Sequence, residues 1–188
     1  MQSRWCIVCI SVLVASMSLV LLGPPHAPTY FAVSCVLASI LAALSVIDIY
    51  TYRLPDVLTL PLLAAGVVVS YCFEVQPVWW SAVSAIFGFC LLLAIAQVYL
   101  RLRERAGIGL GDAKLLAAAG AWLGAETIST VLLLASMSAL LWAAVQPFHS
   151  SAVTATTRLP FGPFLAFGIW AGWLFGPIHN ASWTAWAW

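Results

Sequence analysis

Two aspartates, Asp48 and Asp112, are the residues of this sequence whose type and surroundings best suit chemistry. Asp48 ends the apolar run of residues 39–47, and Asp112 opens the mostly apolar run of residues 113–119. An aspartate at the centre of a membrane helix costs about 2.5–3.5 kcal/mol, so such residues need an explanation. If the two carboxylates lie close together, both cannot easily ionise, and one keeps its proton. The pair then supplies one base and one acid, the arrangement with which aspartic proteases activate water and protonate a leaving amine.

Each of these acidic residues also has a simpler interpretation. Asp48 could be an interfacial residue that touches water, and Asp112 could be a helix N-terminal carboxylate favoured by the helix dipole and free N–H groups. Asp56 follows Pro55 and precedes an apolar run, which predicts a helix N-cap. Lys114 either pairs with Asp112 or extends to the lipid phosphates. Position along the chain leaves these alternatives open.

Three glycines, Gly107, Gly109 and Gly111, alternate just before Asp112. Glycine permits unusual backbone angles and close approach of another chain, which a peptide substrate near Asp112 would need. A flexible loop explains the same spacing. A dinucleotide-binding loop does not, because no strand or βαβ unit surrounds the glycines.

The remaining candidate residues do not form a metal or cofactor site in the sequence. Cys6 and Cys9 form a C-x-x-C pair inside an apolar run, without the second pair that a zinc site usually has. The three histidines, at positions 26, 149 and 179, are far apart in loops. We therefore expect no metal, no cofactor, and no need for a nucleophilic serine or cysteine.

The elements that position the aspartates are predicted to be membrane helices. Of the 188 residues, 64% are hydrophobic and 7% charged, against about 25% charged in soluble domains. Only helices and closed barrels satisfy backbone groups in lipid, and the apolar runs lack the alternation of barrel strands. The fold class predicted is all-α, a single membrane-embedded domain over residues 1–188. The net charge of +1 gives no basis for nucleic-acid binding.

Seven membrane segments are our best count, within a range of about six to eight. A spanning helix needs about 20 mostly apolar residues. The predicted segments are residues 5–22, 29–48, 56–73, 79–100, 113–123, 127–145 and 161–175, of which the fifth is short. We interpret the first as a retained anchor rather than a signal peptide, whose apolar region is usually shorter.

The basic residues predict the orientation of these segments. With the N-terminus in the cytoplasm, all seven Lys and Arg fall on the cytoplasmic side, as the positive-inside rule expects. Glu74 and Glu126 then fall on the opposite side. Both Asp48 and Asp112 are placed at the cytoplasmic face.

Three blocks of the sequence resemble the bacterial type IV prepilin peptidases, a family of membrane aspartyl peptidases with a GxGD motif. Residues 109–124 (GLGDAKLLAAAGAWLG) resemble the GxGD region, and residues 47–63 (IDIYTYRLPDVLTLPLL) resemble the segment with the first catalytic aspartate. Residues 159–166 (LPFGPFLA) resemble the third block. The resemblance covers about residues 45–175 and is more specific than GxGD alone.

The resemblance implies a catalytic role for Asp48 and Asp112, with Gly109, Gly111 and Lys114 as supporting motif residues. It implies cleavage of prepilins or type II secretion pseudopilins after a short basic leader, at the cytoplasmic face of the bacterial inner membrane. Larger members add a cytoplasmic domain with two C-x-x-C pairs, associated with N-methylation. This sequence shows no such domain, so we expect a peptidase without methyltransferase activity.

Three other functions remain as alternatives. A different GxGD protease, such as a preflagellin peptidase, would differ in its substrate leader. A small cation- or proton-coupled transporter could use the same aspartates, but such proteins often show inverted repeats, and none is visible here. A non-catalytic subunit of a secretion machine would keep the helices and tolerate loss of either aspartate. The oligomeric state is left open.

Overall fold

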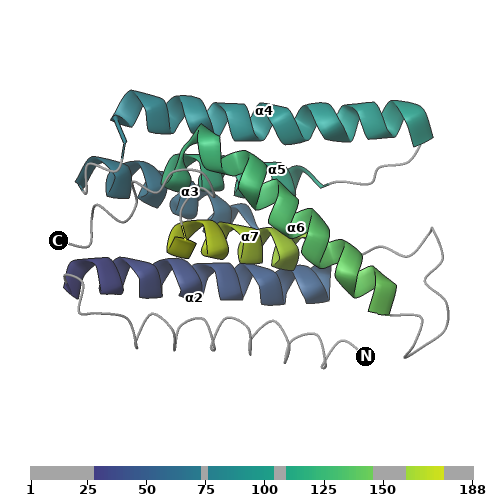
Figure 1. Ribbon diagram of the computed structural model, residues 1–188, viewed down its shortest axis with the longest axis horizontal. Helices are drawn as coiled ribbons and strands as arrows, with labels where there is room; N and C mark the ends of the chain where they lie inside the picture. The colour runs from purple at the N-terminus through teal and green to yellow at the C-terminus, as the bar shows by residue number, and fades with distance from the viewer. Residues whose placement is uncertain (1–27, 73–75, 104–108, 146–159, 176–188) are drawn as a thin grey trace.

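The computed structural model of the chain describes residues 28–72, 76–103, 109–145 and 160–175, which form a bundle of six helices (Figure 1). The helices are α2 (Pro28–Thr51), α3 (Asp56–Cys72), α4 (Val78–Arg103), α5 (Leu110–Leu123), α6 (Ala125–Val145) and α7 (Gly162–Phe175). These residues contain no strand. The all-α prediction is confirmed, and each predicted segment from residue 29 onward coincides with one helix. The predicted segment at residues 5–22 lies outside the described residues.

Three of the helices are long and apolar enough to cross a membrane: Ala32–Thr51 in α2, Val78–Leu102 in α4 and Ala125–Ala144 in α6. The apolar helices α3 and α7 are shorter, with 17 and 14 residues. A 14-residue helix is about 21 Å long, less than the roughly 30 Å of hydrocarbon in a bilayer. The three long apolar helices make the chain a membrane helical bundle. Because α3 and α7 are shorter, the count of seven membrane segments stays a prediction.

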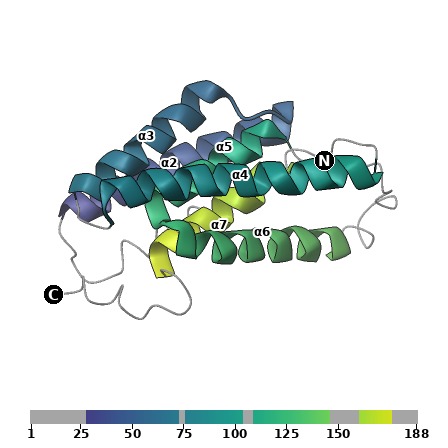
Figure 2. The same cartoon turned by 90° about the horizontal axis from the view of Figure 1, so that it is seen from above.

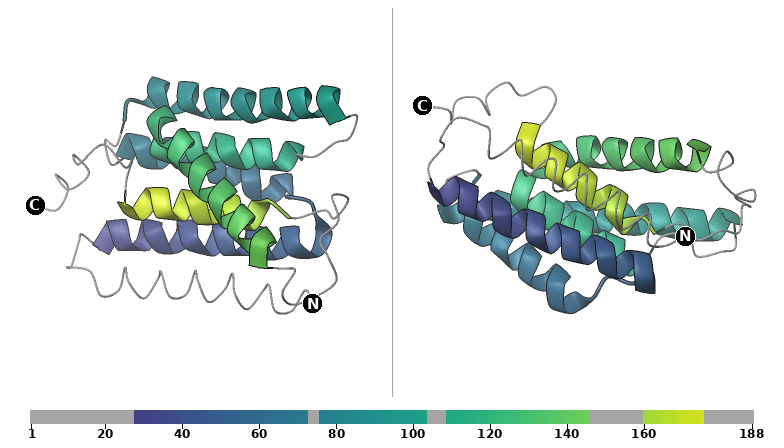
Figure 3. Two further views of the ribbon diagram at one scale, coloured as in Figure 1. Left: turned by 45° about the vertical axis from the view of Figure 1, so that its right-hand side comes forward. Right: turned by 90° about the horizontal axis from the view of Figure 1, so that it is seen from below.

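The short helix α5 lies at the centre of the bundle. It packs against α3, α4, α6 and α7, and eleven of its fourteen residues are buried. Figure 1 shows α5 between α4 on one side and α7 on the other, Figure 2 shows α3 and α6 on opposite sides of the bundle, and the left view of Figure 3 shows α6 crossing obliquely over α7. Since α5 contacts protein on nearly every face, its sequence of alanines and leucines forms the core.

Glycines set the register between α4 and α5. A Cβ added to Gly120 would lie 2.3 Å from the Ser84 carbonyl oxygen, and one added to Gly88 would lie 2.7 Å from the Leu116 carbonyl oxygen. The two backbones are in contact at both points. Because the contacting residue numbers rise along α4 while they fall along α5, the two helices are antiparallel.

Hydrogen bonds hold the C-terminal end of α5 in place. The Ala121 carbonyl accepts bonds from Ser70 Oγ at 2.9 Å, Gln76 Nε2 at 3.0 Å and Ser81 Oγ at 2.8 Å. The indole N–H of Trp122 donates to the Leu62 carbonyl at 2.8 Å. The last carbonyls of a helix have no partner within the helix, so α3, α4 and their connection supply one. The helix end opposite Asp112 is thus anchored.

Candidate active site

Asp48 is buried in the last turn of α2, against the first residue of α7. Only 5% of Asp48 is exposed, and its Oδ2 accepts a hydrogen bond of 2.9 Å from the Gly162 backbone N–H. The N-terminus of a helix favours negative charge, since its N–H groups are free to donate. The interpretation of Asp48 as a water-contacting interfacial residue does not fit this burial.

Asp112 lies in the first turn of α5 and is 9% exposed. Its Oδ2 accepts a hydrogen bond of 3.3 Å from the Gly109 backbone N–H, which immediately precedes the helix. Asp112 therefore has the helix N-terminal position that its simpler interpretation predicts. That position also presents its carboxylate at the end of α5 where α2 ends.

The fold brings the two aspartates together although they belong to different helices. The carboxylates of Asp48 and Asp112 are close enough to interact electrostatically. Each also accepts one backbone N–H, from Gly162 and Gly109 respectively. Two buried like charges disfavour each other, so the arrangement favours one ionised and one protonated carboxyl group. Within the described ranges, no group of three or more His, Cys, Asp or Glu could hold a metal ion.

The two glycines of the motif differ in their surroundings. A Cβ added to Gly111 would lie 2.8 Å from Leu54 Cβ and 3.3 Å from Leu54 Cδ1, which is too close. A Cβ added to Gly109 would lie 3.5 Å from Asp112 Oδ2, an ordinary contact. Gly109 has φ −81° and ψ 150°, angles that any residue adopts. Packing therefore requires glycine at position 111, whereas glycine at position 109 leaves open space beside the Asp112 carboxylate.

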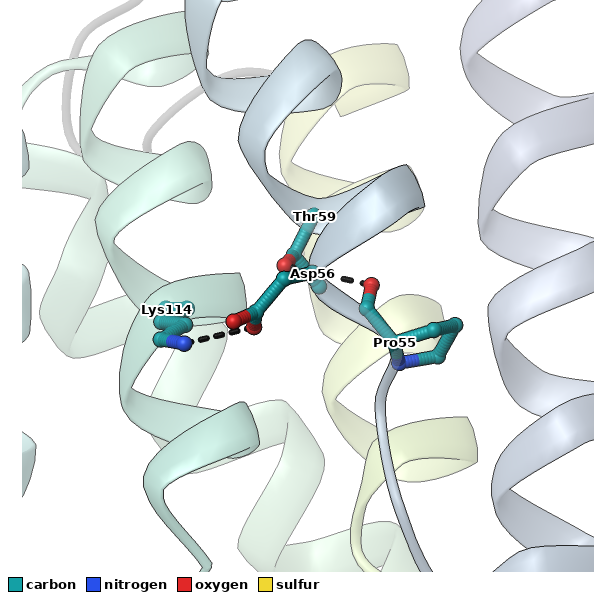
Figure 4. Close-up of polar contacts among 4 residues, drawn as sticks. All are labelled: Pro55, Asp56, Thr59 and Lys114. Carbon is teal, nitrogen blue, oxygen red and sulfur yellow. Dashed lines mark hydrogen bonds and ion pairs between the residues drawn. The ribbon is translucent and has the colours of Figure 1, made fainter.

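Lys114 forms an ion pair with Asp56, the first residue of α3 (Figure 4). Of the two alternatives for Lys114, pairing with Asp112 and extension to lipid phosphates, the structure shows neither. Asp56 was expected to be an N-cap, but it lies inside the first turn of α3 and directs its carboxylate to α5. The Pro55 carbonyl, at the residue before the helix, accepts the Thr59 backbone N–H at 3.2 Å.

Comparison with known proteins identifies the family. The model of the type IV leader peptidase family matches residues 35–144, which include Asp48, the GxGD motif and Lys114. The chain belongs to the type IV leader peptidase family. The resemblance inferred from the three sequence blocks is thereby confirmed, although the third block lies beyond the matched residues.

Curated relatives of this leader peptidase family member carry the name prepilin leader peptidase/N-methyltransferase. One from Burkholderia pseudomallei is 41% identical over 140 residues, which are 74% of this chain and 45% of the relative. One from Aeromonas salmonicida is 36% identical over 141 residues, 73% of this chain and 47% of the relative. One from Escherichia coli K12 is 38% identical over 125 residues, 66% and 55% respectively. The chain spans about half the length of these relatives. No solved structure matches the chain.

The antiparallel register of α4 and α5 places Asp112 well before the C-terminal end of α4. Gly88 lies opposite Leu116 and Ser84 opposite Gly120, so Asp112 is level with Leu92. Helix α4 continues for eleven residues beyond Leu92 to Arg103, about 16 Å at 1.5 Å per residue. Figure 1 shows α4 running on past α5 at this end. Asp112 therefore lies about three helical turns short of the C-terminal end of α4.

Gly162 is a neighbour of the site that the sequence prediction did not single out. A Cβ at this position would lie 2.6 Å from Asp48 Oδ2 and 3.0 Å from its carboxyl carbon. Only glycine lets the start of α7 approach Asp48 closely enough for its N–H to donate. The sequence signal was present in the third block, residues 159–166, where Gly162 follows Phe161 and precedes Pro163.

Proposed function

We propose that this chain is a membrane aspartyl endopeptidase that removes the short basic leader from type IV prepilins or type II secretion pseudopilins. The observation that carries the proposal is the pair of buried, interacting carboxylates of Asp48 and Asp112. Family membership and the names of the relatives support the same activity. Nothing in the comparisons favours the transporter alternative.

The proposed mechanism needs only this pair and a water molecule. The ionised carboxylate takes a proton from water, while the protonated carboxyl group polarises the scissile carbonyl. Water oxygen bonds to the carbonyl carbon, and the tetrahedral intermediate collapses as the leaving nitrogen receives a proton. The C–N bond breaks, and the pair again holds one proton. Because coupled carboxyl groups titrate as a unit, the acid and base roles belong to the pair rather than to either residue.

The backbone donors would hold the pair in position during these steps. The N–H groups of Gly162 and Gly109 each bond one Oδ2, which orients the carboxylates without adding another titrating group. Both carboxylates are largely buried, at 5% and 9% exposure, and burial strengthens the electrostatic interactions between them. In this proposal, cleavage takes place at the cytoplasmic side of the bacterial inner membrane.

The test is cleavage of a prepilin in membranes that contain the protein, compared with Asp48→Asn and Asp112→Asn. We expect both variants to lose cleavage at unchanged protein level, because an amide cannot replace the ionised or the protonated carboxyl group. Glu126→Gln is the matched control, since Glu126 is exposed at the start of α6. Cleavage retained by both aspartate variants would refute the aspartyl mechanism. No cleavage by the intact protein, across several leaders, would favour a transporter or an assembly subunit.

A further inference from the structure

The short connection between α2 and α3, residues 52–55, follows directly on the last turn of α2, in which Asp48 lies. The Tyr52 backbone N–H donates to the Asp48 carbonyl at 2.8 Å, and the Thr51 hydroxyl oxygen lies 2.8 Å from the Ile47 carbonyl and 3.1 Å from the Arg53 carbonyl. Tyr52 has φ 52°, a left-handed conformation that is uncommon outside glycine. The connection therefore turns sharply, and it has a defined shape at the end that bears Asp48.

Two side chains just after this turn contact α5 on both sides of Asp112. Leu54 is buried and lies against Gly111, the residue before Asp112. Asp56 pairs with Lys114, two residues after Asp112. Figure 4 shows the Asp56 and Lys114 side chains directed toward each other across the gap between α3 and α5. The same few residues thus link the Asp48 end of α2 to the Asp112 end of α5.

We propose that Leu54 and Asp56 act as a clamp that sets the separation of the two aspartates, with the Asp56–Lys114 pair as a positioning contact for catalysis. The clamp rests on the proposed peptidase function. The clamp explains why Lys114, two residues after Asp112 in the sequence, pairs with Asp56 rather than with Asp112. Lys114 then acts through Asp56 rather than by touching substrate.

The exposure of the Asp56–Lys114 pair indicates a role in positioning rather than in stability. The side chains of Lys114 and Asp56 are 30% and 56% exposed, and exposed ion pairs contribute little to stability. The bundle is held elsewhere, by the buried faces of α5 and the bonds to the Ala121 carbonyl. Reaction rates are far more sensitive, because a misplacement of about 1 Å can cost about 100-fold. Loss of the pair should therefore slow catalysis in a protein that remains folded.

The experiment compares Lys114→Met, Asp56→Asn and the charge swap Asp56→Lys with Lys114→Asp. We expect each single variant to lower kcat about 10-fold or more with KM within about twofold. The swap should recover most of the lost kcat, because the pair is rebuilt with its ends exchanged. Arg53→Gln is the matched control, since it removes a charge from the same turn but leaves Leu54 and Asp56 in place; we expect it to keep kcat.

A swap that stays as slow as the single variants, at normal protein level, would overturn the clamp, as would single variants with unchanged kcat. A second readout does not depend on peptidase activity. In a background without the native cysteines, Asp48→Cys and Asp112→Cys would be joined by thiol cross-linkers of graded length. We expect Lys114→Met to shift the preferred length and the swap to restore it; an unchanged preference would refute the clamp. If the intact protein cleaves nothing but the cross-link shifts as expected, the peptidase proposal fails while the positioning contact stands.

Discussion

Replacing Gly111 with alanine tests how closely the first turn of α5 must approach Leu54. The new Cβ would lie 2.8 Å from Leu54 Cβ, whereas carbon atoms in contact prefer about 3.5–4.0 Å. One side must therefore move by about 0.7 Å or more. Leu54 Cβ is attached to the backbone and cannot rotate away, so α5 or the connection itself must shift. Asp112 follows Gly111 directly and moves with it.

The expected result is slower cleavage by a protein that still folds and inserts. Overpacking costs typically about 1–3 kcal/mol, which the bundle can absorb. A shift of this size at a catalytic carboxylate can reduce the rate by about 10- to 100-fold. The assay is the initial rate of prepilin cleavage in membranes, normalised to the amount of inserted protein. Leu54→Gly in the Gly111→Ala background removes the clashing Cβ and should recover part of the rate.

Gly109→Ala is the matched comparison. Its Cβ would make only ordinary contacts, with Asp112 Oδ2 at 3.5 Å and the Gly111 backbone nitrogen at 3.9 Å, and the Gly109 backbone angles suit alanine. The backbone N–H that donates to Asp112 is kept. We expect Gly109→Ala to retain normal protein level and to slow cleavage less than Gly111→Ala does. A Gly111→Ala variant with the parental rate, or one that is faster than Gly109→Ala, would refute the reasoning.

Two further predictions concern other parts of the bundle. Gly162→Ala should reduce cleavage at least about 10-fold, since its Cβ would lie 2.6 Å from Asp48 Oδ2 and displace that carboxylate; a normal rate in the same membrane assay would contradict the contact. Ser70→Ala and Ser81→Ala should each cost under about 1 kcal/mol, because the Ala121 carbonyl keeps two other donors, while the double variant should cost more than their sum. Thermal unfolding of the detergent-purified variants measures this, and strictly additive losses would argue against shared capping.

The limits of each described helix could be predicted from sequence to within three residues, because membrane insertion is a local property. A run of about 20 apolar residues satisfies its own backbone bonds and its solvent wherever it lies in the fold. The predicted ends at Asp56 and Leu123 coincide with those of α3 and α5, and the end at Phe175 coincides with that of α7. Asp48 and Asp112 could likewise be singled out as candidates, since a carboxylate next to an apolar run is costly in a membrane and therefore suggests a functional site.

The contacts of those residues depended on how helices far apart in the sequence pack. The partner of Lys114 could be read as Asp112, two positions away, but on a helix such neighbours face different directions, and the packing of α3 against α5 supplies Asp56 instead. Gly162 meets Asp48 across more than a hundred positions because α7 starts where α2 ends. Two glycines in one motif look equivalent in sequence, yet only Gly111 faces Leu54. The length and hydrophobicity of the apolar runs, together with the free-energy cost of placing a charge in lipid, determine which segments enter the membrane. Which residues meet is decided by how the helices cross, and side-chain and glycine contacts between the helices determine those crossings.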